Sequence, residues 1–503
     1  MKKINWKLIL IVLGIVLFGS LLLAYKIGDQ YMWTDEVFSF HAARMILEKG
    51  EPLYDSGLFY GRAEIYNYIL AFSMKIFGAN EFGSRIINIP FALGTTLLSF
   101  FFVRDVFKQN KYKTILALCA SILYITSCFT IASVRETRMY AMTVFLFSLS
   151  SFSFYKALIS QHSTKILKIK GWVFRYNIPW LIIFLASFYI GYQTQPITII
   201  LGVCILIFYM FRLILKRRKE DLLFVALLIT IAFGAVYLLF NTLNIYQVFL
   251  ALSPEWATEA PKLLYYPILL VRNFPGIALI SPLIIYSIFK YHKTFDIYLI
   301  TIFLVYILFI SLQRAQHERY LEPVLAILPV ILVTSVFRIT ENIAAKNKSL
   351  KVWLLIFISL IITIPQGYLL QKELREIDTY TPASIAIYKK MEFNKLFTYL
   401  DTENLDKTIL ITDYNSAFTL YEKGFTPNYI LVTKARYELE QKKYDIYFHI
   451  QYLVYPEDLK KLKAENSNCI VILRDKDNFP DIEQYVTPQS TLNGPFIYTT
   501  SNE

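Results

Sequence analysis

The sequence predicts a polytopic α-helical membrane protein, with about 11 transmembrane helices and a small C-terminal soluble α/β domain. Of its 503 residues, 56% are hydrophobic and only 18% are charged, and the mean hydropathy is +0.45. Apolar runs of roughly 17 to 22 residues, long enough to cross a bilayer, recur as far as about residue 370. Beyond that point the composition becomes charged, as in a soluble domain.

The net charge of +13 reports orientation in a membrane. Lys and Arg concentrate in short loops between the apolar runs, and such loops lie on the inner side by the positive-inside rule. We therefore expect a lipid bilayer, and no nucleic acid, as the partner of this charge. The four cysteines encode no disulfide framework, because three lie inside apolar runs and Cys469 stands alone in the tail.

About eleven apolar runs alternate with basic inner loops in a consistent topology. Residues 8–24 form the first, which we interpret as a retained helix because no small-residue cleavage site follows it. The others cover residues 86–103, 114–132, 141–158, 180–192, 197–211, 222–240, 277–289, 297–312, 321–337 and 352–369. An odd number of crossings from an inner N-terminus predicts a multi-pass protein of the cell membrane whose tail lies on the extracytoplasmic side.

The first outer loop, residues 26–84, carries two adjacent acids just after the first crossing, in the stretch Trp33-Thr34-Asp35-Glu36. Apolar residues at helical spacing over 37–47 predict a short interfacial helix that begins at these acids, with Thr34 or Asp35 as its cap. A second amphipathic piece, residues 65–77, is short for a crossing and is placed beside the membrane. A capped, solvated helix start is the plainest explanation of the two acids.

The tail is predicted to form a separate domain. From about Gln371 onward, short β-rich runs at residues 408–412, 429–433 and 469–473 alternate with helix-like pieces such as 456–464. About 120 residues are enough for a modest core. We therefore expect two parts: a transmembrane domain, residues 1–370, that includes the first outer loop, and an extracytoplasmic α/β domain, residues 371–503.

The predicted outer face collects charged residues at or next to helix ends. Each would cost roughly 2.5 to 3.5 kcal/mol if it were unpaired at depth in the bilayer. The set consists of Asp35, Glu36, Arg62, Arg135, Glu136, Arg138, Arg272, His317 and Arg319. Mutual pairing would explain many of the arginines. A base carboxylate beside several guanidiniums would also suit a substrate with a phosphate leaving group.

Several motifs of the outer loops resemble those of the GT-C membrane glycosyltransferases. The similar members are the dolichyl-phosphate-mannose protein mannosyltransferases and the bacterial aminoarabinose transferases of lipid A, and the resemblance covers most of residues 1–370. The motifs are Trp33-Thr34-Asp35-Glu36, Phe59-Tyr60-Gly61-Arg62, Ile65-Tyr66-Asn67-Tyr68, the run 76–85, Arg135-Glu136-Thr137-Arg138-Met139-Tyr140 and Arg319-Tyr320-Leu321-Glu322-Pro323.

The resemblance implies an inverting, polyprenyl-phosphate-dependent glycosyltransferase of the cell envelope. It would move a hexosyl or pentosyl group from the lipid-linked donor to an acceptor glycan, lipid or protein hydroxyl on the outer face. By carry-over, Asp35 is the general base, Glu36 is the other member of the acid pair, and Glu136 is a second acidic position. Arg62 would meet the donor phosphate. The other arginines expected at this phosphate are Arg135, Arg138 and Arg319.

Two alternatives stay open at this stage. A multi-pass transporter for a lipid-linked or anionic substrate would also carry membrane charges, although these would gather near the midplane and not at one face. A structural or receptor role would leave the acid pair without a purpose. No cofactor is certain: a divalent metal ion could bind acids of the outer face together with His317, but no ligand spacing compels one, and we predict no metal site.

Overall fold

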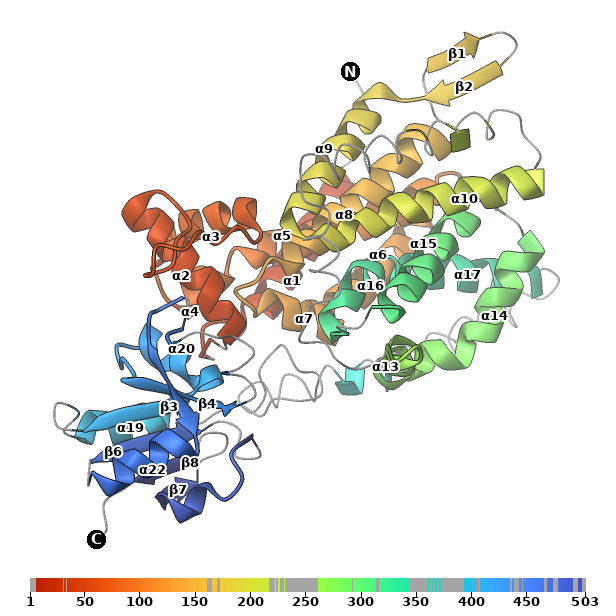
Figure 1. The fold of residues 1–503 in the computed structure, drawn as a ribbon. Coiled ribbons are helices and arrows are strands. Elements are labelled where there is room, and N and C mark those ends of the chain that lie inside the picture. The colour runs from red at the N-terminus through yellow and green to blue at the C-terminus, as the bar shows by residue number, and fades with distance from the viewer. Residues whose placement is uncertain are drawn as a thin grey trace. The chain divides into compact units, whose positions relative to one another are not determined.

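The computed structural model of the chain describes most of the predicted elements (Figure 1). The described residues are 6–29, 31–32, 34–160, 165–169, 172–216, 261–291, 293–313, 316–343, 393–403, 408–434, 443–445, 447–465, 468–473, 478–491 and 496–499, with single residues between 222 and 230 and between 361 and 371, and at 405 and 437. The predicted crossings 222–240 and 352–369, and Trp33, lie wholly or largely outside the described residues.

The chain divides into two compact units. The helical unit contains Met1–Tyr25, Asn88–Val134 and Met139–Leu374. The mixed unit contains Lys26–Ile87, Arg135–Arg138 and Arg375–Glu503. The first outer loop thus belongs to the same unit as the tail. The short segment Arg135–Arg138, which lies between two apolar helices in the sequence, also belongs to this unit. The predicted domain boundary near residue 370 adjoins residues outside the described ranges.

The helical unit consists of apolar helices and one hairpin. The helices are α1 (Trp6–Ala24), α5 (Asn88–Val106), α6 (Lys113–Ile125), α7 (Cys128–Val134), α8 (Tyr140–Phe154), α9 (Ile178–Thr194), α10 (Ile200–Lys216), α13 (Tyr265–Asn273), α14 (Pro275–Tyr291), α15 (Thr294–Ser311), α16 (Glu322–Leu325) and α17 (Leu328–Ile343). A single π-helical turn, Tyr155–Ile159, follows α8, and β1 (Lys165–Ile169) pairs with β2 (Trp172–Tyr176) before α9 begins.

Within the described residues, five helices are long and apolar enough to cross a membrane, or up to seven if each of two bent helix pairs counts as one span. They match the crossings predicted at residues 8–24, 86–103, 114–132, 141–158, 197–211, 297–312 and 321–337. The crossing predicted at 180–192 coincides with the shorter apolar helix α9, and the one at 277–289 with α14. The multi-pass helical fold is confirmed, and the count of about eleven stays a prediction.

Small polar side chains let the helices of this unit approach closely. The hydroxyls of Ser150 in α8 and Ser187 in α9 lie 2.8 Å apart, and the Tyr298 hydroxyl of α15 donates to the Ser151 carbonyl at 2.9 Å. Such contacts between helices replace the hydrophobic driving force that is absent in lipid. They hold α8 in place, and α8 begins just after the segment 135–138 that enters the mixed unit.

The mixed unit contains two helices of the first outer loop, as predicted. The interfacial helix is α2 (Thr34–Lys49), and the amphipathic piece is α3 (Glu64–Phe77), which is followed by the short α4 (Glu81–Arg85). The one described correction concerns the cap. Because α2 begins at Thr34, the residues Thr34, Asp35 and Glu36 all lie in its first turn, so neither Thr34 nor Asp35 precedes the helix as its cap.

The rest of the mixed unit is an α/β domain around a six-stranded sheet with the order β5-β4-β3-β6-β8-β7. Its elements are α19 (Phe393–Thr402), β3 (Ile409–Asp413), α20 (Tyr414–Glu422), β4 (Tyr429–Thr433), β5 (Gln451–Tyr455), α22 (Glu457–Ala464), β6 (Cys469–Leu473), β7 (Thr487–Thr491) and β8 (Phe496–Thr499). The first four strands in this order are parallel, and β8 and β7 are antiparallel to their neighbours. The three predicted strands and the predicted helix are confirmed.

Candidate functional site

The two adjacent acids of α2 have different surroundings. The Glu36 side chain is fully buried, whereas 26% of the Asp35 side chain remains exposed. Residues one apart on a helix point about 100° away from each other, so one can face the core while the next faces solvent. The difference decides which carboxylate a substrate could reach.

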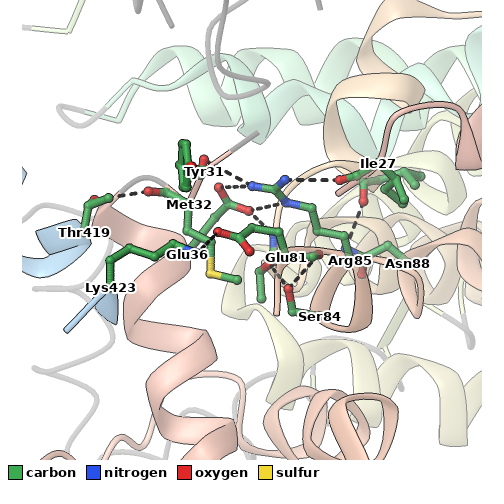
Figure 2. A network of polar contacts seen from close by, with 12 residues as sticks. Ile27, Tyr31, Met32, Glu36, Glu81, Ser84, Arg85, Asn88, Thr419 and Lys423 are labelled. Carbon is green, nitrogen blue, oxygen red and sulfur yellow. Dashed lines mark hydrogen bonds and ion pairs between the residues drawn. The ribbon is translucent and has the colours of Figure 1, made fainter. Parts of the chain in front are cut away.

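Glu36 forms a buried, two-pronged ion pair with Arg85 of α4. Arg85 donates from Nε to Oε1 at 3.0 Å and from Nη2 to Oε2 at 3.1 Å, and neither side chain is exposed. The Thr137 amide also donates to Glu36 Oε1, at 2.7 Å. Figure 2 shows Arg85 reaching as well toward the carbonyls of Ile27 and Tyr31, to which it donates at 3.2 and 3.4 Å. Glu36 therefore ties together the start of α2, α4 and the segment 135–138.

Asp35 lies beside the guanidinium of Arg138. The distance from Arg138 Nη2 to Asp35 Oδ2 is 3.9 Å. Arg138 Nη1 also donates to the Asp35 carbonyl at 2.8 Å and to the hydroxyls of Ser39 and Tyr60 at 3.0 Å each. Only 1% of the Arg138 side chain is exposed. The guanidinium is thus fixed on several sides, and it holds Asp35 at the edge of the buried network.

The segment Arg135–Arg138 supplies the other predicted charges of this unit. Arg135, Glu136 and Arg138 are all buried. The segment is held by the Thr137 hydroxyl, which lies 2.9 Å from the Ser84 hydroxyl of α4, and by the Thr137 amide on Glu36. With Arg62, which is described next, six predicted site residues belong to one compact unit: Asp35, Glu36, Arg62, Arg135, Glu136 and Arg138.

Arg62 is exposed on the loop that leads into α3. Its carbonyl accepts a hydrogen bond from Asn67 Nδ2 at 2.9 Å, and the next residue, Ala63, takes a left-handed backbone conformation with φ 53°. These contacts fix the backbone while the side chain faces solvent. Tyr60, whose hydroxyl meets Arg138, is only two residues away, so the same loop serves both arginines.

Arg319 and His317 belong to the helical unit. Arg319 lies in a short 3₁₀ turn, Glu318–Leu321, with its guanidinium 5.3 Å from the ring centroid of Tyr140. The carbonyl of His317 accepts a hydrogen bond from the Tyr266 hydroxyl at 3.1 Å. A contact between Arg319 and a donor phosphate stays a prediction.

The sequence did not single out Arg85 and Tyr60 of this network as site residues, nor His41 of the same helix α2. Arg85 and Tyr60 belong to the outer-loop motifs of the sequence, so membership in a motif could have indicated them. His41 had no such signal: its Nδ1 lies 2.8 Å from Arg44 Nη2 and its Nε2 lies 3.3 Å from Asp55 Oδ1. The Tyr421 hydroxyl of α20 donates to the same Asp55 carboxylate.

The tail domain packs on α2 and its loop through further contacts of α20. The Thr419 hydroxyl donates to the Met32 carbonyl at 3.1 Å, and Lys423 Nζ lies 2.6 Å from Glu81 Oε1 (Figure 2). Partial burial, and secondarily the Glu81 carboxylate, raise the pKa of Tyr31 above its usual value. A cavity of about 130 Å³ lies next to these contacts, on the Val37, Phe40 and Arg44 face of α2.

The described residues do not form a ready metal site. No three His, Cys, Asp or Glu side chains among them converge as ligands. Of the acids considered from the sequence, Glu36 already has both oxygens on Arg85.

Comparison with known proteins relates this arrangement to solved structures. No family model matches the chain, and no curated protein matches it by sequence. The structure of ArnT from Cupriavidus metallidurans in the apo state is similar with a TM-score of 0.61 at 11% identity, over 98% of each chain. ArnT bound to undecaprenyl phosphate gives a TM-score of 0.57 at 11% identity over 99% of each chain.

A third similar structure is the archaeal oligosaccharyltransferase AglB from Archaeoglobus fulgidus, in complex with an inhibitory peptide and a dolichol-phosphate. Its TM-score is 0.56 at 11% identity, over 92% of this chain and 69% of AglB. At such low identity the likeness concerns the fold. The chain thus has the fold of ArnT and AglB, in line with the resemblance of its outer-loop motifs.

Proposed function

We propose that the protein transfers a sugar from a polyprenyl-phosphate donor to an acceptor hydroxyl at the outer face of the membrane, with inversion at the anomeric carbon. The observation that carries this proposal is that the two adjacent acids of α2 differ in burial and in their partners. Glu36 is buried in an ion pair with Arg85, while the neighbouring Asp35 stays partly exposed and lies beside Arg138. An accessible carboxylate on a rigid support is what a general base requires.

In the proposed reaction, Asp35 accepts the proton of the acceptor hydroxyl as its oxygen attacks the anomeric carbon. A bond forms between that oxygen and the carbon, and the bond from the carbon to the phosphate oxygen breaks on the opposite side. The polyprenyl phosphate leaves with the bonding electrons. Such a leaving group needs no acid to protonate it, so one base and nearby cations are sufficient, unlike the two carboxylates of a glycoside hydrolase.

We propose two different roles for the arginines. Arg138 is almost fully buried, donates hydrogen bonds to three acceptors and lies 3.9 Å from the Asp35 carboxylate, so we assign it to positioning the base. Arg62 is exposed two residues from Tyr60, so we assign it to the donor phosphate. Guanidinium groups suit this task because they bind phosphate oxygens in a bidentate way. Arg135 and Arg319 stay candidates for the same phosphate.

The comparisons support the donor class. ArnT was solved with undecaprenyl phosphate and AglB with a dolichol-phosphate, which are both polyprenyl-type lipid phosphates. For this chain the sugar and the acceptor class, whether glycan, lipid or protein hydroxyl, stay open.

The deciding experiment offers the purified full chain a panel of polyprenyl-phosphate sugars with candidate acceptors. Release of polyprenyl phosphate together with a glycosylated acceptor is the expected result. Movement of intact donor across a reconstituted vesicle without cleavage would instead favour the transporter. Absence of both with every donor would remove the support for either function.

Arg62→Ala is expected to raise KM for the donor by about tenfold and to leave kcat nearly unchanged. A phosphate contact made equally in the ground state and transition state contributes uniform binding, which appears in KM alone. Lys49→Ala is the matched control, because it removes an exposed cation from the end of α2. A fall in kcat with unchanged KM for Arg62→Ala would contradict the assignment.

The sidedness of the site is tested by cysteine labelling in a background without native cysteines. Cys469 itself is buried in β6, so it is a poor probe of the folded tail. Lys461→Cys serves as the probe instead, since 73% of the Lys461 side chain is exposed. We expect an impermeant reagent to label Lys461→Cys in intact cells and to leave Lys111→Cys, in the basic loop after α5, unlabelled. The reverse pattern would invert the topology.

A further inference from the structure

A second hollow lies within the helical unit, where α5 and α8 end and α6 and α9 begin. Its volume is about 560 Å³. One wall is apolar and consists of Leu98, Phe101, Leu149, Phe152 and Trp180. Phe101 is 37% exposed, so this wall is open to the surroundings of the unit.

The rim of this hollow is strongly basic. Four cations line it with a single carboxylate, Asp105; they are Arg104, Lys108, Lys113 and Lys156. Lys156 Nζ lies 2.7 Å from Asp105 Oδ1, and that ion pair neutralises the carboxylate. Among the described residues that line the hollow, no further acid balances the other three cations.

The three remaining cations come from the end of α5, the following turn and the start of α6. Lys113 Nζ donates to the Lys108 carbonyl at 2.9 Å, which fixes its position but leaves its charge. Arg104 Nε is buried and has no hydrogen-bond partner within the part of the chain that the structure describes. A buried guanidinium N–H without an acceptor is costly, so an acceptor from a bound molecule would stabilise it.

Trp180 at this end of the unit is typical of a residue at a lipid–water boundary. Trp180 lies in the first turn of α9, with its ring 5.4 Å from that of Phe152 and Lys156 Nζ 6.0 Å from its centroid. Trp is enriched at the level of the headgroups, and basic pockets between transmembrane helices on the inner side bind anionic headgroups. By the positive-inside rule, this basic end is the inner one.

We propose that the hollow is a binding site for one anionic phospholipid of the inner leaflet. Its phosphate would lie against Arg104, Lys108 and Lys113, and an acyl chain would follow the apolar wall. Cations that only fix topology would be solvated and dispersed, whereas these converge on one hollow and include a buried N–H group. The proposal concerns a part of the chain that the transfer reaction does not use, and it stands whether or not that reaction is correct.

The test titrates the full chain in neutral detergent with phosphatidylglycerol, and separately with phosphatidylcholine of the same acyl chains. Retained lipid is counted by native mass spectrometry. We expect phosphatidylglycerol to bind at least tenfold more tightly. Arg104→Gln and Lys108→Gln should each weaken it by about fivefold, since one cation near an anionic lipid contributes about 1 kcal/mol.

Lys111→Gln is the matched control, because it removes an exposed cation of the same loop that does not line the hollow. It should bind phosphatidylglycerol as the parent does. If Lys111→Gln lost as much affinity for phosphatidylglycerol as Arg104→Gln and Lys108→Gln do, the lipid would be held by diffuse surface charge and the proposal would be wrong. Equal affinity for phosphatidylcholine and phosphatidylglycerol would also overturn it. Displacement of the lipid by millimolar inorganic phosphate would make the occupant a soluble anion. If Arg104→Gln does not fold, the affinity of Lys108→Gln for phosphatidylglycerol decides the proposal, because Lys108 is exposed.

Discussion

Asp35→Asn is expected to lower turnover by roughly 10² to 10⁴ while donor affinity stays close to that of the parent. Asn has nearly the same size, and its side-chain oxygen can occupy the place of Asp35 Oδ2 beside Arg138, 3.9 Å away in the parent. It cannot accept the proton of the acceptor hydroxyl. Turnover is measured as polyprenyl phosphate released, and affinity as donor bound in the absence of acceptor.

The competing explanation is that Asp35 only stabilises its helix. An acid in the first turn contributes about 0.3 to 1 kcal/mol through the helix dipole, too little to unfold the unit. On that explanation Asp35→Asn would keep near-normal turnover with a small loss of thermal stability. Full activity in Asp35→Asn combined with an inactive, folded Glu136→Gln would move the base to Glu136, which lies in the same unit.

Local features of this chain could be predicted because local sequence determines them. The helical spacing of apolar residues after the acid pair predicted α2, and the short β-rich runs predicted β3, β4 and β6. Long apolar runs located the spans that the structure describes. Each of these elements buries an apolar face or crosses lipid. Apolar residues therefore recur in it at a regular spacing or in a long run, and the sequence shows this pattern directly.

Contacts between distant segments could not be predicted in the same way. The grouping of the first outer loop with the tail depends on pairs such as Thr419 with Met32 and Tyr421 with Asp55, which are more than 360 residues apart. Neither member of such a pair carries a periodic signal. The motifs identified the loops that carry the candidate site. The contacts between their side chains could be identified only from the structure.

The contrast between Asp35 and Glu36 illustrates this limit. In the sequence the two acids are equivalent neighbours, and both were assigned to catalysis. Their partners distinguish them: Arg85, 49 residues after Glu36, takes up both Glu36 oxygens, whereas Asp35 lies beside Arg138 and stays partly exposed. The geometry therefore favours a positioning role for Glu36, and this role has its own test.

Removing one member of the buried Glu36–Arg85 pair is expected to destabilise the mixed unit by about 3 to 5 kcal/mol, the largest stability effect we predict. Arg85→Met leaves the Glu36 carboxylate buried without its guanidinium partner, beside the Thr137 amide. Glu36→Gln leaves the Arg85 guanidinium buried beside a neutral amide in place of a carboxylate, near the carbonyls of Ile27 and Tyr31. Pulse proteolysis in increasing denaturant measures the loss.

The double variant Glu36→Gln with Arg85→Met separates a charge effect from a packing effect. It buries no net charge, and the side-chain carbonyl of the introduced glutamine can still accept the Thr137 amide, so we expect a loss of only about 2 kcal/mol from the missing hydrogen bonds. Lys461→Ala is the control, since its ion pair with Asp458 is exposed and its loss should cost at most about 1 kcal/mol. The contrary outcome is a loss of unfolding free energy in the double variant that equals the sum of the losses in the two single variants. The pair would then act through shape and not through charge. Glu36 would lose its proposed role of connecting α2, α4 and the segment 135–138.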